Sequence, residues 1–411
     1  MTVVSAEMPG AASVSVGIWI GVGSRHEDES LNGSAHFIEH MLFKGTKRRN
    51  VKQIAQEVES LGGYLNAYTC EDQTCYYARG RAADWRTLLD VLWDMYSGAT
   101  FPKRELDRER EVIKEERAMY LDEPSQLVQE TLGTAMWPDH PLGRPIEGTE
   151  ESLDGLTRAR LRGFLASHYI PGNTFISAAG KISHRSLVNE IRRMSKGIAG
   201  GQERPGFDPV PKQCVRPQIT SIRRDIEQTQ IALSIDTCPR TDPRRYAMRL
   251  LSTLLAENMS SRLYQSLRER HGLAYSVSSS PNHFADIGDL TISAGVDSDR
   301  LTQALELTQK ELRRLKRRAP SAEELKAACD YVIGQFELYL ESSENYMTWL
   351  GESVAGHGDI ASPNLVKKRL RSVSPKDVLT VAREFIRPEN MTLAVVSPRK
   401  GERNLERYLD C

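Results

Sequence analysis

The segment HFIEH at residues 36–40 places two imidazoles and a carboxylate within five residues. Its surroundings predict a mostly buried helix, with Ser34 as a possible N-cap and apolar residues on the face that packs. Positions i and i+4 share a helix face, so His36 and His40 lie one turn apart with Glu39 on the same side. This arrangement can hold a zinc ion on two ring nitrogens and place a carboxylate beside the water that the ion activates. The pattern also occurs on helices that bind no metal.

A catalytic zinc site needs a third protein ligand. The acidic segment 105–123 predicts a helix on which Glu109 and Glu116 lie seven residues apart, two turns along one face. One of them could bind the metal while the other orients the site. Glu111 and Glu115 are equally available in the same segment, and the spacing alone leaves this choice open. Most acidic helices are solvated surfaces without any metal.

The order H-x-x-E-H resembles the inverzincins, the pitrilysin family of zinc peptidases. The resemblance is closest to the short branch that includes bacterial processing-peptidase-like proteins and the subunits of mitochondrial processing peptidase. It extends over nearly the whole chain and rests on the segments "GSRHED", "HFIEHMLFKGTKRR", "LGGYLNAYTCEDQTCYYA", "REREVIKEE", "HPLGRPIEGT" and "SSRLYQSLRERHGLAYSV".

The resemblance implies that His36 and His40 bind one Zn2+ per chain and that Glu39 is the general base. In the family the ligand glutamate follows the second histidine by 76 or 77 positions, which selects Glu116. The supporting glutamate seven residues earlier corresponds to Glu109. The site would then have three protein ligands and an open position.

The resemblance also implies residues that bind the peptide substrate. "LGGYLNAYT" is similar to an edge strand that takes an extended peptide as an added strand, with Asn66 and Ala67 in contact with it. Arg268 and Tyr275 match an Arg/Tyr pair that reaches the active site formed by the other copy. Family members of this length pair two chains into a clamshell chamber. A homodimer is therefore expected, with Arg268 and Tyr275 supplied by the partner chain.

The sequence predicts two copies of one α+β unit. The Gly-, Pro- and charge-rich segment 196–218 indicates a linker between a catalytic zinc-binding domain at 1–195 and a homologous domain at 219–411. A shift of 217 residues aligns Pro171-x-Asn173 with Pro388-x-Asn390, and the strand from Val14 with that from Ile231.

The mixed periodicities in each copy predict a mainly antiparallel sheet covered by helices, so the processing-peptidase-like half clamshell is the expected fold. The second copy has no histidine where the first has HFIEH, and we expect it to bind no metal.

Composition excludes several other classes of protein. The 55 basic and 55 acidic residues balance, which gives no support to a nucleic-acid or membrane-surface binder. The sequence contains no run of 18 apolar residues, so it predicts no membrane span. The six cysteines form no C-x-x-C pair, so we expect reduced thiols. No Lys or Arg precedes Arg25, so the basic region of a signal peptide is missing and we expect a cytoplasmic location.

The sequence therefore predicts a zinc-dependent endopeptidase that hydrolyses unfolded or short peptides in an enclosed chamber. The alternative is a non-catalytic binding or assembly subunit, since the family contains members that lost their ligands. A structural zinc site is weaker, because such sites normally have four ligands.

Overall fold

The computed structural model describes the chain except for residues 199, 201–203, 212–217, 358–359 and 400–403. It forms two compact units. Unit 1 contains Met1–Ala118, Arg144–Asp208 and Glu337–Ile360, and unit 2 contains Met119–Gly143, Pro209–Phe336 and Ala361–Cys411. Part of the predicted linker 196–218 lies outside the described residues. The predicted boundaries 1–195 and 219–411 divide the sequence into repeats and stay a prediction.

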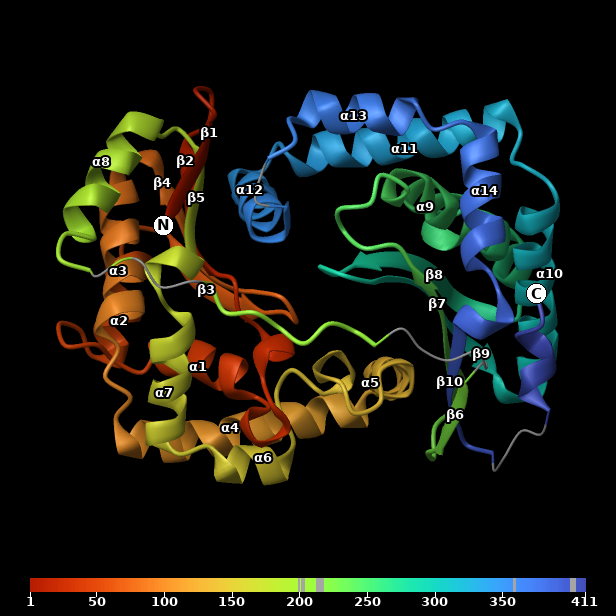
Figure 1. The fold of residues 1–411 in the computed structure, drawn as a ribbon, viewed down its shortest axis with the longest axis horizontal. Coiled ribbons are helices and arrows are strands. Elements are labelled where there is room, and N and C mark those ends of the chain that lie inside the picture. The colour runs from red at the N-terminus through yellow and green to blue at the C-terminus, as the bar shows by residue number, and fades with distance from the viewer. Residues whose placement is uncertain (199, 201–203, 212–217, 358–359, 400–403) are drawn as a thin grey trace. The chain divides into compact units, whose positions relative to one another are not determined.

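Unit 1 is built on a five-stranded sheet with the order β1-β5-β2-β4-β3 (Figure 1). Only β1 and β5 are parallel, and the other neighbours are antiparallel. The strands are β1 (Thr2–Glu7), β2 (Ser13–Ile20), β3 (Tyr64–Thr69), β4 (Thr74–Arg81) and β5 (Thr174–Gly180). The helices are α1 (Ser34–Leu42), α2 (Val51–Glu59), α3 (Trp85–Gly98), most of α4 (Lys103–Asp122), α6 (Glu150–Gly155), α7 (Arg158–His168), α8 (His184–Met194) and α12 (Ser343–His357).

Unit 2 repeats this topology with the order β6-β10-β7-β9-β8. Its strands are β6 (Gln218–Arg223), β7 (Gln228–Thr237), β8 (Ala274–His283), β9 (Gly288–Asp297) and β10 (Met391–Ser397). Its α-helices are α5 (Pro124–Met136), α9 (Arg245–Ser252), α10 (Leu301–Arg317), most of α11 (Ala322–Tyr339), α13 (Pro363–Arg371) and α14 (Pro375–Phe385), and two π-helical segments are η6 (Thr253–Glu257) and η7 (Tyr264–Arg270). The shared topology confirms the predicted pair of α+β units with mainly antiparallel, helix-covered sheets.

The register of the two sheets corrects one detail of the predicted repeat. Val16 lies opposite Ala178 in unit 1, and Ile231 lies opposite Val395 in unit 2. Since Ala178 and Val395 are 217 residues apart, Ile231 corresponds to Val16, and its predicted alignment with Val14 was two residues out of register. A two-residue slip keeps the same side chains on the same face, so the apolar pattern could not reveal it.

Each unit also includes a helix from the other half of the chain. In unit 1, α12 covers the sheet face opposite to α1 and α3, where Gly17 and Gly351 make room for close packing. A Cβ on Gly351 would lie 2.0 Å from the Trp19 ring, and one on Gly17 would lie 2.6 Å from the Met347 sulfur. In unit 2, α5 packs in the same way against β10, β7 and β6.

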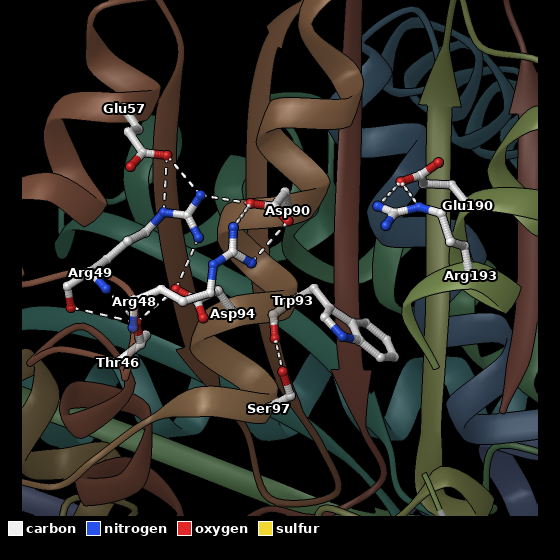
Figure 2. Close-up of polar contacts among 10 residues, drawn as sticks. All are labelled: Thr46, Arg48, Arg49, Glu57, Asp90, Trp93, Asp94, Ser97, Glu190 and Arg193. Carbon is white, nitrogen blue, oxygen red and sulfur yellow. Dashed lines mark hydrogen bonds and ion pairs between the residues drawn. The ribbon is translucent and has the colours of Figure 1, made fainter. Parts of the chain in front are cut away.

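An ion-pair network holds the loop between α1 and α2. Figure 2 shows Arg49 between three carboxylates, Glu57 of α2 and Asp90 and Asp94 of α3. Arg49 lies 2.8 Å from Glu57, 2.6 Å from Asp90 and 2.9 Å from Asp94. The side chains of Arg49 and Asp94 are 8% and 4% exposed, so this pair is largely withdrawn from water, whereas Asp90 and Glu57 stay partly exposed. The network fixes the loop that leaves the C-terminal end of α1.

None of the helices in the described part of the chain has the length and apolar character that a membrane span requires. The described cysteines are free thiols, namely Cys70, Cys75, Cys238, Cys329 and Cys411, while Cys214 lies outside the described residues.

Candidate metal centre

α1 and α4 bring three donor side chains together in unit 1. His36, His40 and Glu116 each offer one atom, and these atoms lie within 4.8 Å of one another. Glu116 Oε2 is 3.5 Å from His40 Nε2 and 4.0 Å from His36 Nε2. Tetrahedral ligands at ~2.0–2.1 Å from zinc lie about 3.4 Å apart, so the three groups fit a zinc ion with little movement. Glu111 and Glu115 are exposed and do not belong to this group.

Glu109 supports His40 from the same helix that carries Glu116. Its Oε1 lies 2.9 Å from His40 Nδ1, and its Oε2 lies 2.6 Å from Lys44 Nζ. Burial would raise the pKa of Glu109, but the hydrogen bonds from His40 and Lys44 outweigh it and lower the pKa. An ionised Glu109 accepts a hydrogen bond from the Nδ1–H of His40, which leaves Nε2 with a free lone pair, as a metal ligand requires.

Lys44 was missed by sequence reasoning. It lies four residues after His40 and two residues beyond the end of α1, so only its closeness to His40 in the sequence could have suggested it. The ammonium group balances the buried charge of Glu109, which is 5% exposed.

His36 is more buried and has a different environment. It is 8% exposed, and burial, followed by the nearby His40, lowers its pKa to about 3. A neutral imidazole is the form that binds a metal. Among the described residues, its buried Nδ1 has no hydrogen-bond partner. The protein therefore fixes the orientation of this ring by packing rather than by a hydrogen bond.

Glu39 faces the same side of α1 and receives a hydrogen bond from β3. The Thr69 hydroxyl donates to Glu39 Oε2 at 2.6 Å. Burial raises the pKa of Glu39, while the Thr69 hydrogen bond and His40 oppose this shift. A carboxylate with a raised pKa is a stronger base. Thr69 was also missed, although it follows the predicted substrate strand residues Asn66 and Ala67 by only two or three positions.

Asn66 and Ala67 lie on β3, the last strand in the sheet order of unit 1. β3 packs against α1, so this edge strand lies next to the helix that carries His36 and His40. The Asn66 side chain is exposed, and its Oδ1 accepts the N–H of Ala67 at 2.8 Å. The contact with substrate that the resemblance implies for these two residues stays a prediction.

Arg268 and Tyr275 belong to unit 2, where they contact each other. The Arg268 guanidinium lies 5.2 Å from the centre of the Tyr275 ring and 5.0 Å from that of Tyr264. Tyr275 is 76% exposed and Arg268 is partly exposed, so the pair presents an aromatic hydroxyl and part of a cation to solvent. Its catalytic role stays a prediction.

Comparison with known proteins decides the family. Residues 2–150 match the family model described as Insulinase (Peptidase family M16), and residues 155–331 match the Peptidase M16 inactive domain. The chain belongs to peptidase family M16. This confirms the resemblance found in the sequence, and the name of the second M16 domain agrees with a second copy that lacks the HFIEH motif.

M16 relatives cover almost the full length of the chain. An uncharacterized zinc protease of Streptomyces coelicolor is 35% identical over 98% of this chain and 88% of that protein. An uncharacterized zinc protease of Bacillus subtilis is 35% identical over 95% and 94%. The fold is similar to that of a protease from Helicobacter pylori, with a TM-score of 0.90, 22% identity and 96% coverage of both chains.

Proposed function

We propose that the protein is a zinc-dependent endopeptidase that hydrolyses unfolded or short peptides. The observation that carries this proposal is the convergence of His36, His40 and Glu116 beside a hydrogen-bonded Glu39. Two relatives named zinc proteases, each at 35% identity, support the same conclusion. His36, His40 and Glu116 would hold one zinc ion per chain, which when bound acidifies water and polarises a carbonyl group.

The chain's own residues supply the proton transfers. Glu39 removes a proton from the attacking water as the water oxygen bonds to the scissile carbonyl carbon. Thr69 holds one Glu39 oxygen by its 2.6 Å hydrogen bond, which leaves the other oxygen for the water. The proton on Glu39 then passes to the leaving nitrogen as the C–N bond breaks. The products are an amine and a carboxylic acid, which releases its proton to solvent to become a carboxylate.

The remaining predicted residues complete this proposal. Glu109 acts in catalysis by holding His40, and the open edge of β3 binds the extended peptide near Asn66 and Ala67. Arg268 and Tyr275 assist from the partner chain of a homodimer, by binding a substrate carbonyl and stabilising the developing oxyanion. The free thiols of the described cysteines agree with a cytoplasmic location.

Glu39→Gln tests the general base. The variant should keep its zinc and lose peptide hydrolysis by about 10²- to 10⁴-fold. The measurement is cleavage of a mixed peptide library by the purified protein, with and without a chelator. Full turnover by Glu39→Gln would exclude Glu39 as the base. A wild-type protein that binds peptides and zinc but cleaves nothing would indicate the alternative, a non-catalytic binding subunit.

Glu116→Gln tests the third ligand, and Glu115→Gln is its matched control on the adjacent, exposed position. Metal analysis should show clearly weakened zinc binding for Glu116→Gln only. Release of zinc by Glu115→Gln instead would mean that the ligand assignment is wrong by one residue.

A further inference from the structure

The N-terminus of α1 has no capping side chain of its own. The residue before the helix is Gly33, with a left-handed backbone at φ 90° and ψ −1°. A Cβ at this position would lie 2.6 Å from the carbonyl oxygen of Glu147, so glycine is required. Glycine has no side-chain oxygen for the free N–H groups of the first turn, which are buried here. Their acceptor has to come from another part of the chain.

Glu27 provides that acceptor from the preceding loop. Its Oε1 accepts the N–H of Ala35 at 2.6 Å, and its Oε2 accepts the N–H of Gly33 at 2.8 Å. The Asn32 amide also donates to Oε2, at 3.3 Å, and reaches the carbonyl oxygen of Pro145 at 2.9 Å. Glu27 is 2% exposed. Both oxygens of a buried carboxylate thus accept from the turn that begins α1.

Burial and hydrogen bonding act on Glu27 in opposite directions. Burial outweighs the N–H groups of Ala35 and Gly33, which stabilise the ionised form, and the net pKa of the carboxyl is raised to about 8. The positive end of the α1 dipole acts in the same sense as these donors. Arg144 anchors the backbone here by donating from Nη1 to the Glu27 carbonyl oxygen at 3.2 Å. The interactions that hold the helix end therefore also favour the charge on Glu27.

We propose that Glu27 is a positioning residue that fixes His36 through the first turn of α1. Ala35, whose N–H donates to Glu27, directly precedes His36. Since α1 has only nine residues, its own hydrogen bonds stabilise the first turn weakly. Fraying of this turn would displace the His36 ring, while Glu39 and His40 lie one turn further into the helix. The inference rests on the proposed function, because it takes His36 as a metal ligand.

Glu27→Gln tests the role of the second carboxylate oxygen with almost no change in shape. Both oxygens accept from backbone amides, so the NH₂ of a glutamine faces an N–H in either orientation. We expect zinc binding about 10- to 100-fold weaker, measured by competition with a chromophoric chelator. Amide hydrogen exchange over residues 33–37 should become faster. Glu29→Gln makes the same substitution at an exposed position in the same loop and should change neither quantity.

Activity at saturating zinc separates positioning from chemistry. Glu27→Gln should regain most of its kcat when zinc saturates the site, whereas Glu39→Gln should not. A folded Glu27→Gln protein with unchanged zinc affinity and unchanged exchange over residues 33–37 overturns the inference. If Glu27→Gln does not fold, Glu27→Asp takes its place. The shorter carboxylate should weaken zinc binding and speed exchange to a smaller extent, and no change in either overturns the inference.

Failure of the proposed function can be distinguished from failure of the inference about Glu27. If the wild-type protein binds zinc but cleaves no peptide, the hydrolytic role fails, and the zinc affinities of Glu27→Gln and Glu29→Gln still decide the role of Glu27. If the wild-type protein binds no zinc, hydrogen exchange over residues 33–37 decides whether Glu27 holds the turn.

Discussion

The Nδ1 atom of His40 lies 2.9 Å from Oε1 of Glu109. His36 has no such partner for its Nδ1 among the described residues. The two imidazoles on one face of α1 are therefore held by different means. A carboxylate on α4 orients His40, whereas burial and the first turn of α1 orient His36. Loss of either support should weaken zinc binding by a different route.

Glu109→Ala should weaken zinc binding about 10- to 100-fold. The substitution removes the acceptor that orients His40 and leaves Lys44 without its 2.6 Å ion pair. Zinc dissociation constants from chelator competition measure the effect. Glu111→Ala is the matched control, because Glu111 is exposed on the same helix. Equal zinc affinities of the Glu109→Ala and Glu111→Ala variants would show that Glu109 has no role in zinc binding.

Thr69→Val should lower kcat by about tenfold, or about 1.4 kcal/mol, with zinc content unchanged. Valine has nearly the same shape as threonine but cannot donate to Glu39 Oε2. Thr69→Ser keeps the hydroxyl and should retain most of the activity. Steady-state hydrolysis of one library peptide at saturating zinc measures kcat. A Thr69→Val enzyme as fast as wild type would show that Glu39 needs no support from β3.

Arg49→Ala should destabilise unit 1 by about 3–5 kcal/mol, because it leaves the carboxylate of Asp94, which is 4% exposed, without its cation. The neighbouring Arg48→Ala should cost about 0–1 kcal/mol, since the Arg48 side chain is 56% exposed in its pair with Asp90. Urea unfolding of the two variants provides the comparison. Similar losses for both would mean that burial of the Arg49 network has no energetic consequence.

The raised pKa of Asp236 should make the free energy of unfolding depend on pH. Burial, followed by Asp289 opposite it in the β7–β9 pair, raises the pKa of Asp236 from 3.8 to about 7. The folded state then binds a proton that the unfolded state has lost between about pH 4 and 7, so stability falls as pH rises through this window. Asp236→Asn should raise the free energy of unfolding by roughly 1–3 kcal/mol at pH 8 and hardly change it at pH 4.

Urea unfolding at the two pH values measures this difference. Asp225→Asn changes an exposed carboxylate of the same unit and should have no such effect. An equal gain for Asp236→Asn at both pH values would exclude proton binding by Asp236 as the cause.

Local patterns in the sequence predicted much of the donor group. Helical spacing placed His36, Glu39 and His40 on one side of a buried helix, and the structure has α1 there. The choice of Glu116 needed the family resemblance, because helical spacing compares residues within α4 but does not say which of its turns meets α1. The structure brings Glu116 to the histidines and leaves Glu111 exposed.

The supports of the site could not be predicted in this way. Lys44, Thr69 and Glu27 act on groups that come close only after α1 has packed against α4, β3 and the preceding loop. No periodicity in the sequence records such contacts. The same limit explains the two-residue error between β2 and β7, where apolar alternation is satisfied by either register.

The position of α12 has a consequence for synthesis of the chain. One face of the unit 1 sheet is covered by residues 343–357, which leave the ribosome after most of the chain. Until then Trp19 lacks its packing against Met347 and Gly351 of α12, although its sheet is complete at Gly180. Unit 1 therefore cannot finish folding as an independent N-terminal domain during translation, as domains commonly do. An apolar sheet face stays exposed meanwhile, and this interval is where the nascent chain is most open to chaperones and to aggregation.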